Sequence, residues 1–313
     1  MRVLFCGTPV VAVPTLRALL DSDHDVVGVL TRPPAPVGRR RRLTPSPVHQ
    51  AASEHGLPVV TTDRPHGEDE LAQITALEPQ VSAVVAYGAL LREPALSALP
   101  HGWVNLHFSL LPAWRGAAPV QHAIRAGDTR TGVSTFRIEA GLDTGPVYLT
   151  QDHPIRPWDT AGDLLTELAD VGAPVLVRTL DEIEAGTISP VPQAETGVSH
   201  APRLSAADGH VNWRAPAQVV DRQIRAATPA PGAWTTYDGR RMKIGPVRPD
   251  AEAAALAPGV LEAGAQAVLV GTGSTPVRLT DLAPAGKGWM DATDWARGAR
   301  LPSDARFEGT DDD

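Results

Sequence analysis

The chain has 313 residues, 42% of them hydrophobic, and a formal net charge of -8 at pH 7. This length and apolar content are typical of a globular protein with two domains, and the acidic balance argues against a general nucleic-acid binder. The sequence has one cysteine, Cys6, which excludes an internal disulfide, and its ten histidines form no close His or Cys pair at ligand spacing, so we expect no metal. It also has no run of 18 apolar residues and no basic-then-apolar start, so we expect a cytoplasmic protein without a membrane partner.

Apolar strands alternate with amphipathic helices over the first part of the chain. The patterns predict strands at residues 2–6, 26–30 and 81–86, and helices at residues 10–20, 46–55 and 68–77. This order favours an α/β fold, with a doubly wound, Rossmann-like and mostly parallel sheet. Gly7 is not followed by further glycines at the spacing of a dinucleotide loop, so we expect no nicotinamide or flavin cofactor.

After about residue 100, strands and helices continue to be predicted, and the composition then changes near residue 189. A strand around Trp103 to Leu106 precedes further predicted elements, which are a helix at 120–126, a strand at 133–138, a tight acidic turn at 140–145, a strand at 147–151 and a helix at 160–185. Residues 189–205 are rich in Pro, Ser, Thr and Gly, a composition typical of an exposed linker. We therefore expect a catalytic domain at 1–188, a linker at 189–205 and a second domain at 206–313.

The second domain has the pattern of a small β-barrel. Short strands are predicted at 233–237, 242–247, 259–262, 267–270 and 277–282, separated by turn signals. Asp238-Gly239 predicts a type I′ hairpin between the first two. Several short strands in about 100 residues favour an OB-like barrel.

Polar side chains alternate where the predicted strand around Trp103 to Leu106 stops. Asn105, His107 and Ser109 would face one side of a strand, and Pro112 then begins irregular backbone. In open α/β sheets ligands bind at such strand ends. An amide N–H and an imidazole aimed at one point can stabilise an oxyanion, and the imidazole can also move a proton.

A carboxylate is needed to orient such an imidazole, and the turn of residues 141–145 offers Asp143 between two glycines. Taken singly, each residue has a structural explanation, since Asn and Asp are common in turns and a lone His is usually only hydrogen-bonded. Their combined spacing favours an acyl-transfer site with Asn105, His107 and Asp143 as its catalytic residues. Because the sequence shows no activated serine or cysteine, we expect the nucleophile to belong to the substrate.

The run from Asn105 to Pro112, Asn-x-His-x-Ser-Leu-Leu-Pro, with the later Asp143, resembles the folate-dependent formyltransferases. This resemblance implies 10-formyltetrahydrofolate as co-substrate. It also implies that two short stretches line the folate site, namely Ser109, Leu110, Leu111 and Pro112 in one and Ala86, Tyr87 and Gly88 in the other.

Other segments resemble the members of this family that formylate the α-amino group of methionine on initiator Met-tRNA. They lie at residues 5–16, 31–48, 84–91, 114–121, 200–213 and 227–235 and so run over nearly the whole chain. By the same resemblance, the loop of residues 31–48 enters the tRNA acceptor stem, where arginines contact phosphates. The residues concerned are Arg39, Arg40, Arg41 and Arg42. A basic track for the tRNA body would continue over Arg222, Arg225, Arg240, Arg241, Lys243 and Lys287.

Three alternatives stay open at this point. A sugar-nucleotide formyltransferase shares the Asn-His-Asp set, but the arginine run and residues 116–119, GAAP, argue against it. A glycinamide ribonucleotide transformylase would lack the barrel, and a non-catalytic tRNA-binding module would not need an aligned proton-transfer set. Nothing in the sequence demands an oligomer, so we expect a monomer.

Overall fold

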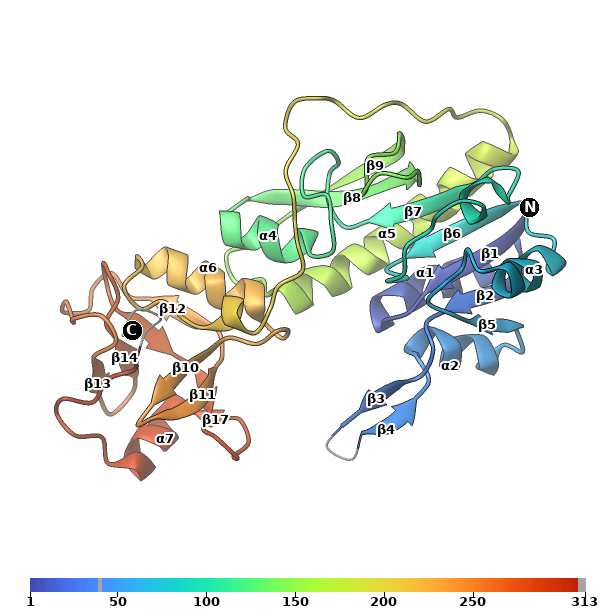
Figure 1. The fold of residues 1–313 in the computed structure, drawn as a ribbon. Helices are drawn as coiled ribbons and strands as arrows, with labels where there is room; N and C mark the ends of the chain where they lie inside the picture. Colours follow the sequence, from blue (N-terminus) through green and yellow to red (C-terminus); the bar gives the residue numbers. More distant parts are fainter. Residues whose placement is uncertain (39–40, 309–313) are drawn as a thin grey trace. The chain divides into compact units, whose positions relative to one another are not determined.

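The computed structural model describes residues 1–38 and 41–308, which divide into two compact units (Figure 1). Unit 1 consists of Met1–Pro119, Arg130–Pro154 and Leu165–His200. Unit 2 consists of Val120–Thr129, Ile155–Leu164 and the remainder from Ala201 onward. In the part of the chain that the structure describes, no helix has the length and apolarity needed to cross a bilayer.

Unit 1 is built on a seven-stranded sheet of order β5-β2-β1-β6-β7-β8-β9. Five neighbouring strands are parallel, and β8 and β9 run antiparallel to their neighbours. The central strands are almost wholly buried apolar segments, as a sheet covered on both faces requires. The bounds are β1 Arg2–Gly7, β2 Asp25–Thr31, β5 Val59–Thr61, β6 Val81–Val85, β7 Trp103–His107, β8 Arg130–Arg137 and β9 Val147–Pro154.

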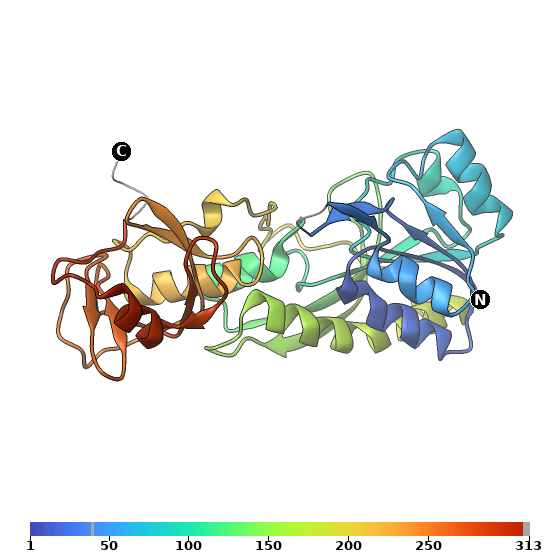
Figure 2. The same ribbon diagram turned by 90° about the horizontal axis from the view of Figure 1, so that it is seen from below.

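Helices cover both faces of this sheet, as the predicted β-α-β order requires. Figure 2 shows α1 Val13–Leu20, α2 Pro47–Glu54 and α5 Ala161–Glu184 on one side, and α3 Glu68–Ala76 apart from them. α5 packs closely on β7, because a Cβ at Gly172 would come within 2.7 Å of Leu106 Cδ2. Side chains alternate along a strand, so Asn105 and His107 project from the opposite face.

Unit 1 also has a two-stranded antiparallel ribbon, β3 Ala35–Val37 and β4 Arg42–Thr44, which stands beyond the sheet in Figure 1. The sequence predicted an irregular loop here. Unit 1 also has 3-10 turns at Val10–Ala12 and Ala95–Ser97. Unit 2 has one at Ala207–Gly209 and, from its second residue onward, the helix α4 Pro119–Ala126.

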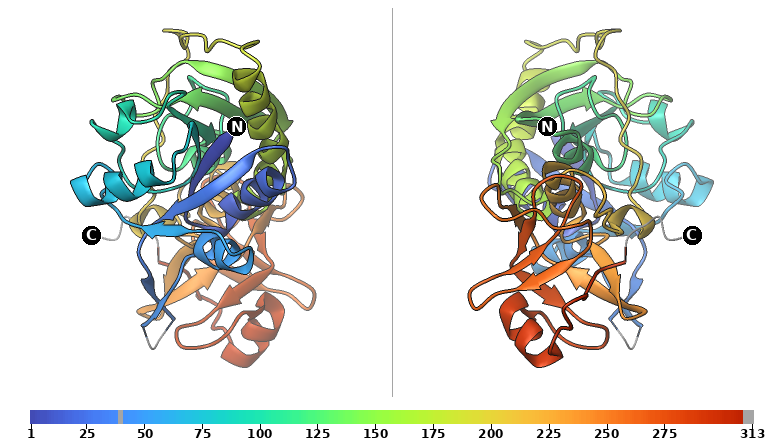
Figure 3. Two further views of the ribbon diagram at one scale, coloured as in Figure 1. Left: turned by 90° about the vertical axis from the view of Figure 1, so that its right-hand side faces the viewer. Right: turned by 90° about the vertical axis from the view of Figure 1, so that its left-hand side faces the viewer.

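Unit 2 contains two four-stranded antiparallel sheets, β10-β11-β16-β17 and β12-β15-β14-β13 (Figure 3). β11 continues into β12 and β15 into β16, and the pairing passes from Ile244↔Leu282 to Val247↔Leu279 across the bend. Isolated bridges Thr236↔Glu308 and Val260↔Arg306 then join the two outer edges. The expected antiparallel barrel is confirmed, and it is closed by residues 306–308.

The strands of unit 2 are β10 Trp234–Tyr237, β11 Arg240–Ile244, β12 Val247–Pro249, β13 Leu261–Ala263, β14 Val268–Val270, β15 Val277–Leu279, β16 Asp281–Ala283 and β17 Met290–Asp291. Asp238 and Gly239 both have positive φ, 51° and 66°, as a type I′ hairpin needs. Two helices that the sequence analysis missed, α6 Ala217–Ala227 and α7 Ala292–Ala299, pack on the barrel.

The segment expected to be an exposed linker is partly docked. Val191 pairs with Val147 through two backbone hydrogen bonds of 2.8 Å, and Ser199 O accepts from Arg115 N at 2.9 Å. Residues up to His200 accordingly belong to unit 1. Most of residues 191–200 are exposed, as expected for the linker, but the docking of Val191 and Ser199 was not predicted, because a Pro-rich chain without regular structure can still give its backbone and side chains to a neighbouring loop. The division into domains at 1–188, 189–205 and 206–313 stays a prediction.

Candidate active site

The imidazole of His107 lies at the carboxyl end of β7, 6% exposed, with a different partner at each ring nitrogen. Nε2 is 2.9 Å from the carbonyl oxygen of Trp114. A carbonyl can only accept, so in the neutral ring the proton sits on Nε2 and donates to Trp114. Nδ1 then carries the lone pair and faces Asp143 Oδ2 at 3.8 Å. Two of the predicted catalytic residues are thus brought together from β7 and from the turn after β8.

Asp143 sits on the tight turn that connects β8 and β9. Its φ of 51° is in the left-handed region, which Asp tolerates better than most residues. Its carboxylate accepts from Gly116 N at 2.7 Å, so it is fixed as well as charged. Gly145 closes the turn against Arg137, where a Cβ would lie 1.7 Å from the carbonyl oxygen, so no larger residue fits without moving the backbone.

Asn105 precedes His107 by two residues on β7, so both project from the same face of the sheet. The residue is half-buried. Its backbone pairs with Val84 and Phe136, which fixes where the side chain begins. Among the described residues none hydrogen-bonds to the Asn105 amide, which leaves its N–H groups available to a substrate oxygen.

The electrostatics of the pair favour a neutral imidazole in the free protein. Burial lowers the pKa of His107 below its ordinary value of 6.5, and the Asp143 carboxylate and the Trp114 carbonyl oppose that shift only in part. In this state the ring is arranged to accept a proton at Nδ1, with Asp143 ready to stabilise the charge. For His107 to donate to an oxyanion through Nε2–H, its hydrogen bond to the Trp114 carbonyl would have to be replaced by one to the substrate oxygen.

The loop after β7 is held by serines. Ser109 is fully buried and its hydroxyl donates to Ala113 O at 2.6 Å, so its side chain shapes the loop. Ser134 of β8 donates to Ser109 O at 2.7 Å and accepts from Leu111 N at 3.0 Å. The next three predicted folate residues, Leu110, Leu111 and Pro112, are half-buried and offer apolar surface.

The second predicted folate stretch follows β6. Tyr87 is 2% exposed, and its hydroxyl donates to Thr62 O at 2.7 Å, so this side chain anchors the strand end. Ala86 and Gly88 are exposed on either side of it, with positive φ of 46° and 81°. Ala86 and Gly88 are therefore reachable by a ligand, whereas the Tyr87 ring is not, and the carbonyls of Tyr87 and Gly88 already accept from Thr8 Oγ1 at 2.7 Å and from Arg32 Nη1 at 3.1 Å. The folate role of these residues stays a prediction.

Part of the predicted arginine run belongs to the β3–β4 ribbon, where Arg42 begins β4 and Arg41 precedes it. Arg39 and Arg40 lie outside the described residues. Arg41 and Arg42 are exposed. Val37 and Leu43 on the ribbon are 57% and 66% exposed, so the described part of the tip presents apolar as well as cationic groups.

The proposed basic track over unit 2 is only partly exposed. Arg225 is 7% exposed, and its Nε donates to Asp221 Oδ2 at 2.9 Å, so its charge is already compensated inside unit 2 and its predicted tRNA contact is wrong for this structure. Arg241 lies 4.2 Å above the Trp234 ring. The residues of the track that are exposed are Arg240, Arg241, Lys243 and Lys287.

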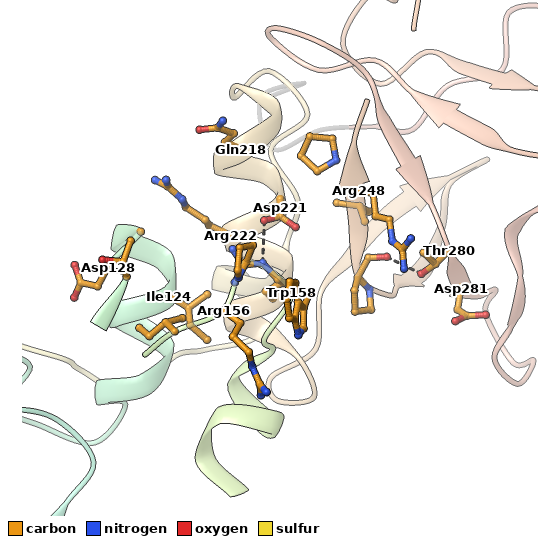
Figure 4. A pocket seen from close by; sticks show the side chains of 18 residues that line it. Ile124, Asp128, Arg156, Trp158, Gln218, Asp221, Arg222, Arg248, Thr280 and Asp281 are labelled. Atoms are coloured by element: carbon orange, nitrogen blue, oxygen red, sulfur yellow. Dashed lines mark hydrogen bonds and ion pairs between the residues drawn. The ribbon is translucent and has the colours of Figure 1, made fainter. Parts of the chain in front are cut away.

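A cavity of about 970 Å³ lies within unit 2, between α4, α6 and β12 (Figure 4). Trp158, which is 70% exposed, stands at its centre with Arg222 beside it. Four arginines and three aspartates line it, so their charges nearly cancel. Its lining does not include Asn105, His107 or Asp143.

Cys6 is buried and hydrogen-bonded to Ser82 at 3.1 Å, and burial raises the pKa of its thiol to about 12, so it is not a nucleophile. Within residues 1–38 and 41–308, no three His, Cys, Asp or Glu side chains gather as a metal site. Residues that support the site but were missed are Ser134, Gln193 and Ser199. No local sequence pattern identifies them, because each lies at least 23 residues from the residue that it contacts in the site loops.

Comparisons with known proteins agree with this geometry. The formyl transferase family model matches residues 1–180, and that of the formyl transferase C-terminal domain matches residues 203–300. The methionyl-tRNA formyltransferase of Thermobifida fusca is 56% identical over 307 residues, covering 98% of this chain and 99% of the relative. That of Acidothermus cellulolyticus is 54% identical over 324 residues, covering 98% and 100%.

A solved structure of similar fold is the N-formyltransferase of Helicobacter canadensis, in complex with folinic acid and dTDP-3-aminofucose. It superposes with a TM-score of 0.67 at 18% identity and covers 88% of this chain and 98% of its own. Both family models, and relatives that are more than half identical over nearly their whole length, therefore indicate the same family. The chain belongs to the formyl transferase family, on the branch of the methionyl-tRNA formyltransferases.

Proposed function

We propose that this protein transfers the formyl group of 10-formyltetrahydrofolate to the α-amino group of methionine on initiator Met-tRNA. The observation that carries the proposal is the pairing of buried His107 with Asp143, beside the available amide of Asn105, at the end of a parallel strand. Relatives that carry this activity in their name match both units, which supports a tRNA acceptor over a smaller one.

The chemistry needs no protein nucleophile. An α-amine titrates near pH ~7.7, so a useful neutral fraction exists at physiological pH. Its lone pair attacks the formyl carbon and the carbonyl electrons move to oxygen, where the Asn105 amide donates to the developing oxyanion. Collapse of this intermediate breaks the bond between the formyl carbon and N10.

A proton must travel from the attacking amine to the departing N10 for this exchange to balance. His107 Nδ1 is the basic atom of the pair, because Nε2 already donates to Trp114. A proton taken up at Nδ1 faces Asp143, whose carboxylate offsets the new charge, and is then returned to N10. The products are tetrahydrofolate and formylmethionyl-tRNA, and the protein ends with its protons where they began.

Incubation of the purified protein with 10-formyltetrahydrofolate and charged tRNAs tests this assignment. We expect formylation of initiator Met-tRNA and much slower reaction of elongator Met-tRNA. A parallel arm supplies nucleotide-linked amino sugars, because the Helicobacter canadensis N-formyltransferase shares the fold and was solved with such a ligand. Formylation of the amino sugar without that of Met-tRNA would overturn the proposal.

A further inference from the structure

Residues 191–200 cross two loops of the catalytic site. At one end Val191 pairs with Val147, directly after the Asp143 turn. At the other end Ser199 receives hydrogen bonds from the loop after β7, through Arg115 N to its carbonyl at 2.9 Å and Trp114 N to its hydroxyl at 2.8 Å. The segment therefore spans the two loops that hold the partners of His107.

Gln193 joins the same two loops through its side chain. Its Oε1 accepts from Arg115 Nε at 3.0 Å and from Nη2 at 2.7 Å. Its Nε2 donates to Asp143 O at 2.7 Å and to Gly145 O at 2.8 Å. An amide has two lone pairs on oxygen and two N–H donors, so every hydrogen-bonding position of this half-buried side chain is used.

These contacts complete a ring around the catalytic pair. Arg115 lies between Trp114, whose carbonyl fixes His107 Nε2, and Gly116, whose N–H fixes the Asp143 carboxylate. Asp143 itself holds a left-handed φ of 51°, which a residue other than glycine keeps only where its surroundings support it. The hydrogen bond from Gln193 Nε2 to the Asp143 carbonyl supplies such support at the backbone.

We propose that Gln193 is a positioning residue, which sets the placement of Asp143 relative to His107. It reaches no reacting atom and acts through the backbone of Asp143 and Gly145. The inference rests on the proposed function in that both concern the same catalytic pair. Without the Gln193 amide, the Asp143 and Gly145 carbonyls and the Arg115 guanidinium lose these hydrogen bonds. The Asp143 carboxylate can then move away from His107 Nδ1. Misplacement of a catalytic group by about 1 Å is worth on the order of 100-fold in rate.

Two variants test the proposal. Gln193→Met removes all four hydrogen bonds at similar size, whereas Gln193→Glu keeps an acceptor for Arg115 and loses the two donors to Asp143 and Gly145. We expect kcat to fall about 10- to 100-fold in both, with KM for each substrate within about twofold. A displaced Asp143 raises the pKa of His107 less, so we also expect an NMR titration of Gln193→Met, which adds no charge, to place that pKa lower than in the wild-type protein.

Gln223 provides the matched control. In unit 2 its amide also links backbone groups, since it donates to Asp208 O at 3.2 Å and His210 O at 2.7 Å and accepts from Asn212 N at 3.3 Å. Gln223→Met therefore loses a comparable set of bonds, yet we expect it to leave the titration of His107 unchanged. In an Asp143→Asn background, Gln193→Met should have little further effect on either readout.

An unchanged kcat in both Gln193 variants, together with an unchanged His107 titration in Gln193→Met, would overturn the proposal. So would an equal loss of kcat in the Asp143→Asn background, because the effect would then not pass through Asp143. If either variant unfolds, the other and the titration still decide. The titration needs no substrate, so a protein that fails to formylate Met-tRNA would refute the proposed function without touching this inference.

Discussion

At the scale of single residues, three side chains of the site differ in their surroundings. Asn105 and His107 are neighbours on one strand, whereas Asp143 comes from a later turn. His107 is buried and its pKa is lowered by that burial, Asp143 is held by a backbone N–H, and the Asn105 amide is left open. A buried titratable group whose pKa is shifted by desolvation and by a specific charged partner is a candidate for a functional site.

Asn105→Ala removes the amide that we expect to meet the oxyanion. The side chain is half-buried and makes no hydrogen bond within the described ranges, so its loss should hardly change the melting temperature. Loss of one oxyanion donor costs about 3–4 kcal/mol, or roughly 100- to 1000-fold in kcat. Single-turnover formylation at saturating substrates measures it, and a rate within threefold of wild type would remove Asn105 from the mechanism.

The protonation of His107 should respond to Asp143 with a defined sign. Burial lowers its pKa below 6.5 and Asp143 opposes that shift, so Asp143→Asn should lower the pKa further. The unfolded chain binds the proton more readily, so this residue contributes stability above pH ~6.5 that is lost as the pH falls below that value. NMR titration of the ring gives both pKa values, and a higher pKa in Asp143→Asn would contradict the geometry.

At the scale of secondary-structure elements, two short stretches are expected to have large effects. Arg41 and Arg42 are exposed, whereas residues 305–308 contribute buried side chains and backbone bridges. We expect the β3–β4 ribbon to contribute to tRNA binding and residues 305–308, which close the barrel, to contribute to the stability of unit 2.

Arg41→Ala and Arg42→Ala should each weaken Met-tRNA binding and flatten its salt dependence. Each arginine that neutralises a phosphate contributes about one unit to the slope of log K against log salt concentration. Arg178 is a suitable control, because it is exposed on α5 and paired with Glu182 at 2.7 Å. Filter binding at several salt concentrations tests this, and slopes equal to those of Arg178→Ala would exclude the ribbon from the tRNA interface.

Phe307→Ala should destabilise unit 2 by about 3–5 kcal/mol, the usual cost of truncating a buried aromatic side chain. The ring is 2% exposed and stacks on Trp213 with centroids 5.5 Å apart. Val219, which is 45% exposed in the same unit, gives the control Val219→Ala, for which we expect a change within about 0.5 kcal/mol. Urea unfolding followed by tryptophan fluorescence measures both, and similar midpoints would show that residues 306–308 do not close the barrel.

At the scale of the whole molecule, charge is distributed unevenly. The chain carries a net charge of -8, yet four consecutive arginines follow Gly38. Repulsion between copies of an acidic protein favours a monomer, while we expect the local cationic run to attract a polyanion. We expect light scattering to give a mass near 33.0 kDa, the mass of one chain, and twice that value would contradict the expectation.

Several features could be predicted from the sequence because local pattern determines them. Buried strands such as Val81–Val85 are continuous apolar runs, and Asp238-Gly239 specifies its hairpin through the positive φ of both residues. Asn105 and His107 share a face simply because strands alternate. The β3–β4 ribbon was missed, because its strands have three residues each and little periodicity.

The sequence by itself determined the fold class, the position of Asn105 and His107 at a strand end, and the family that the motif resembles. Only the tertiary structure decided that Ser109 and Tyr87 are buried supports, that Arg225 is paired inside unit 2, and that Gln193 links the two site loops. Hydrophobic periodicity and turn chemistry act between near neighbours along the chain. A hydrogen bond across 50 residues, such as that from Gln193 to Asp143, leaves no pattern in either segment, because it depends on where folding brings their backbones together.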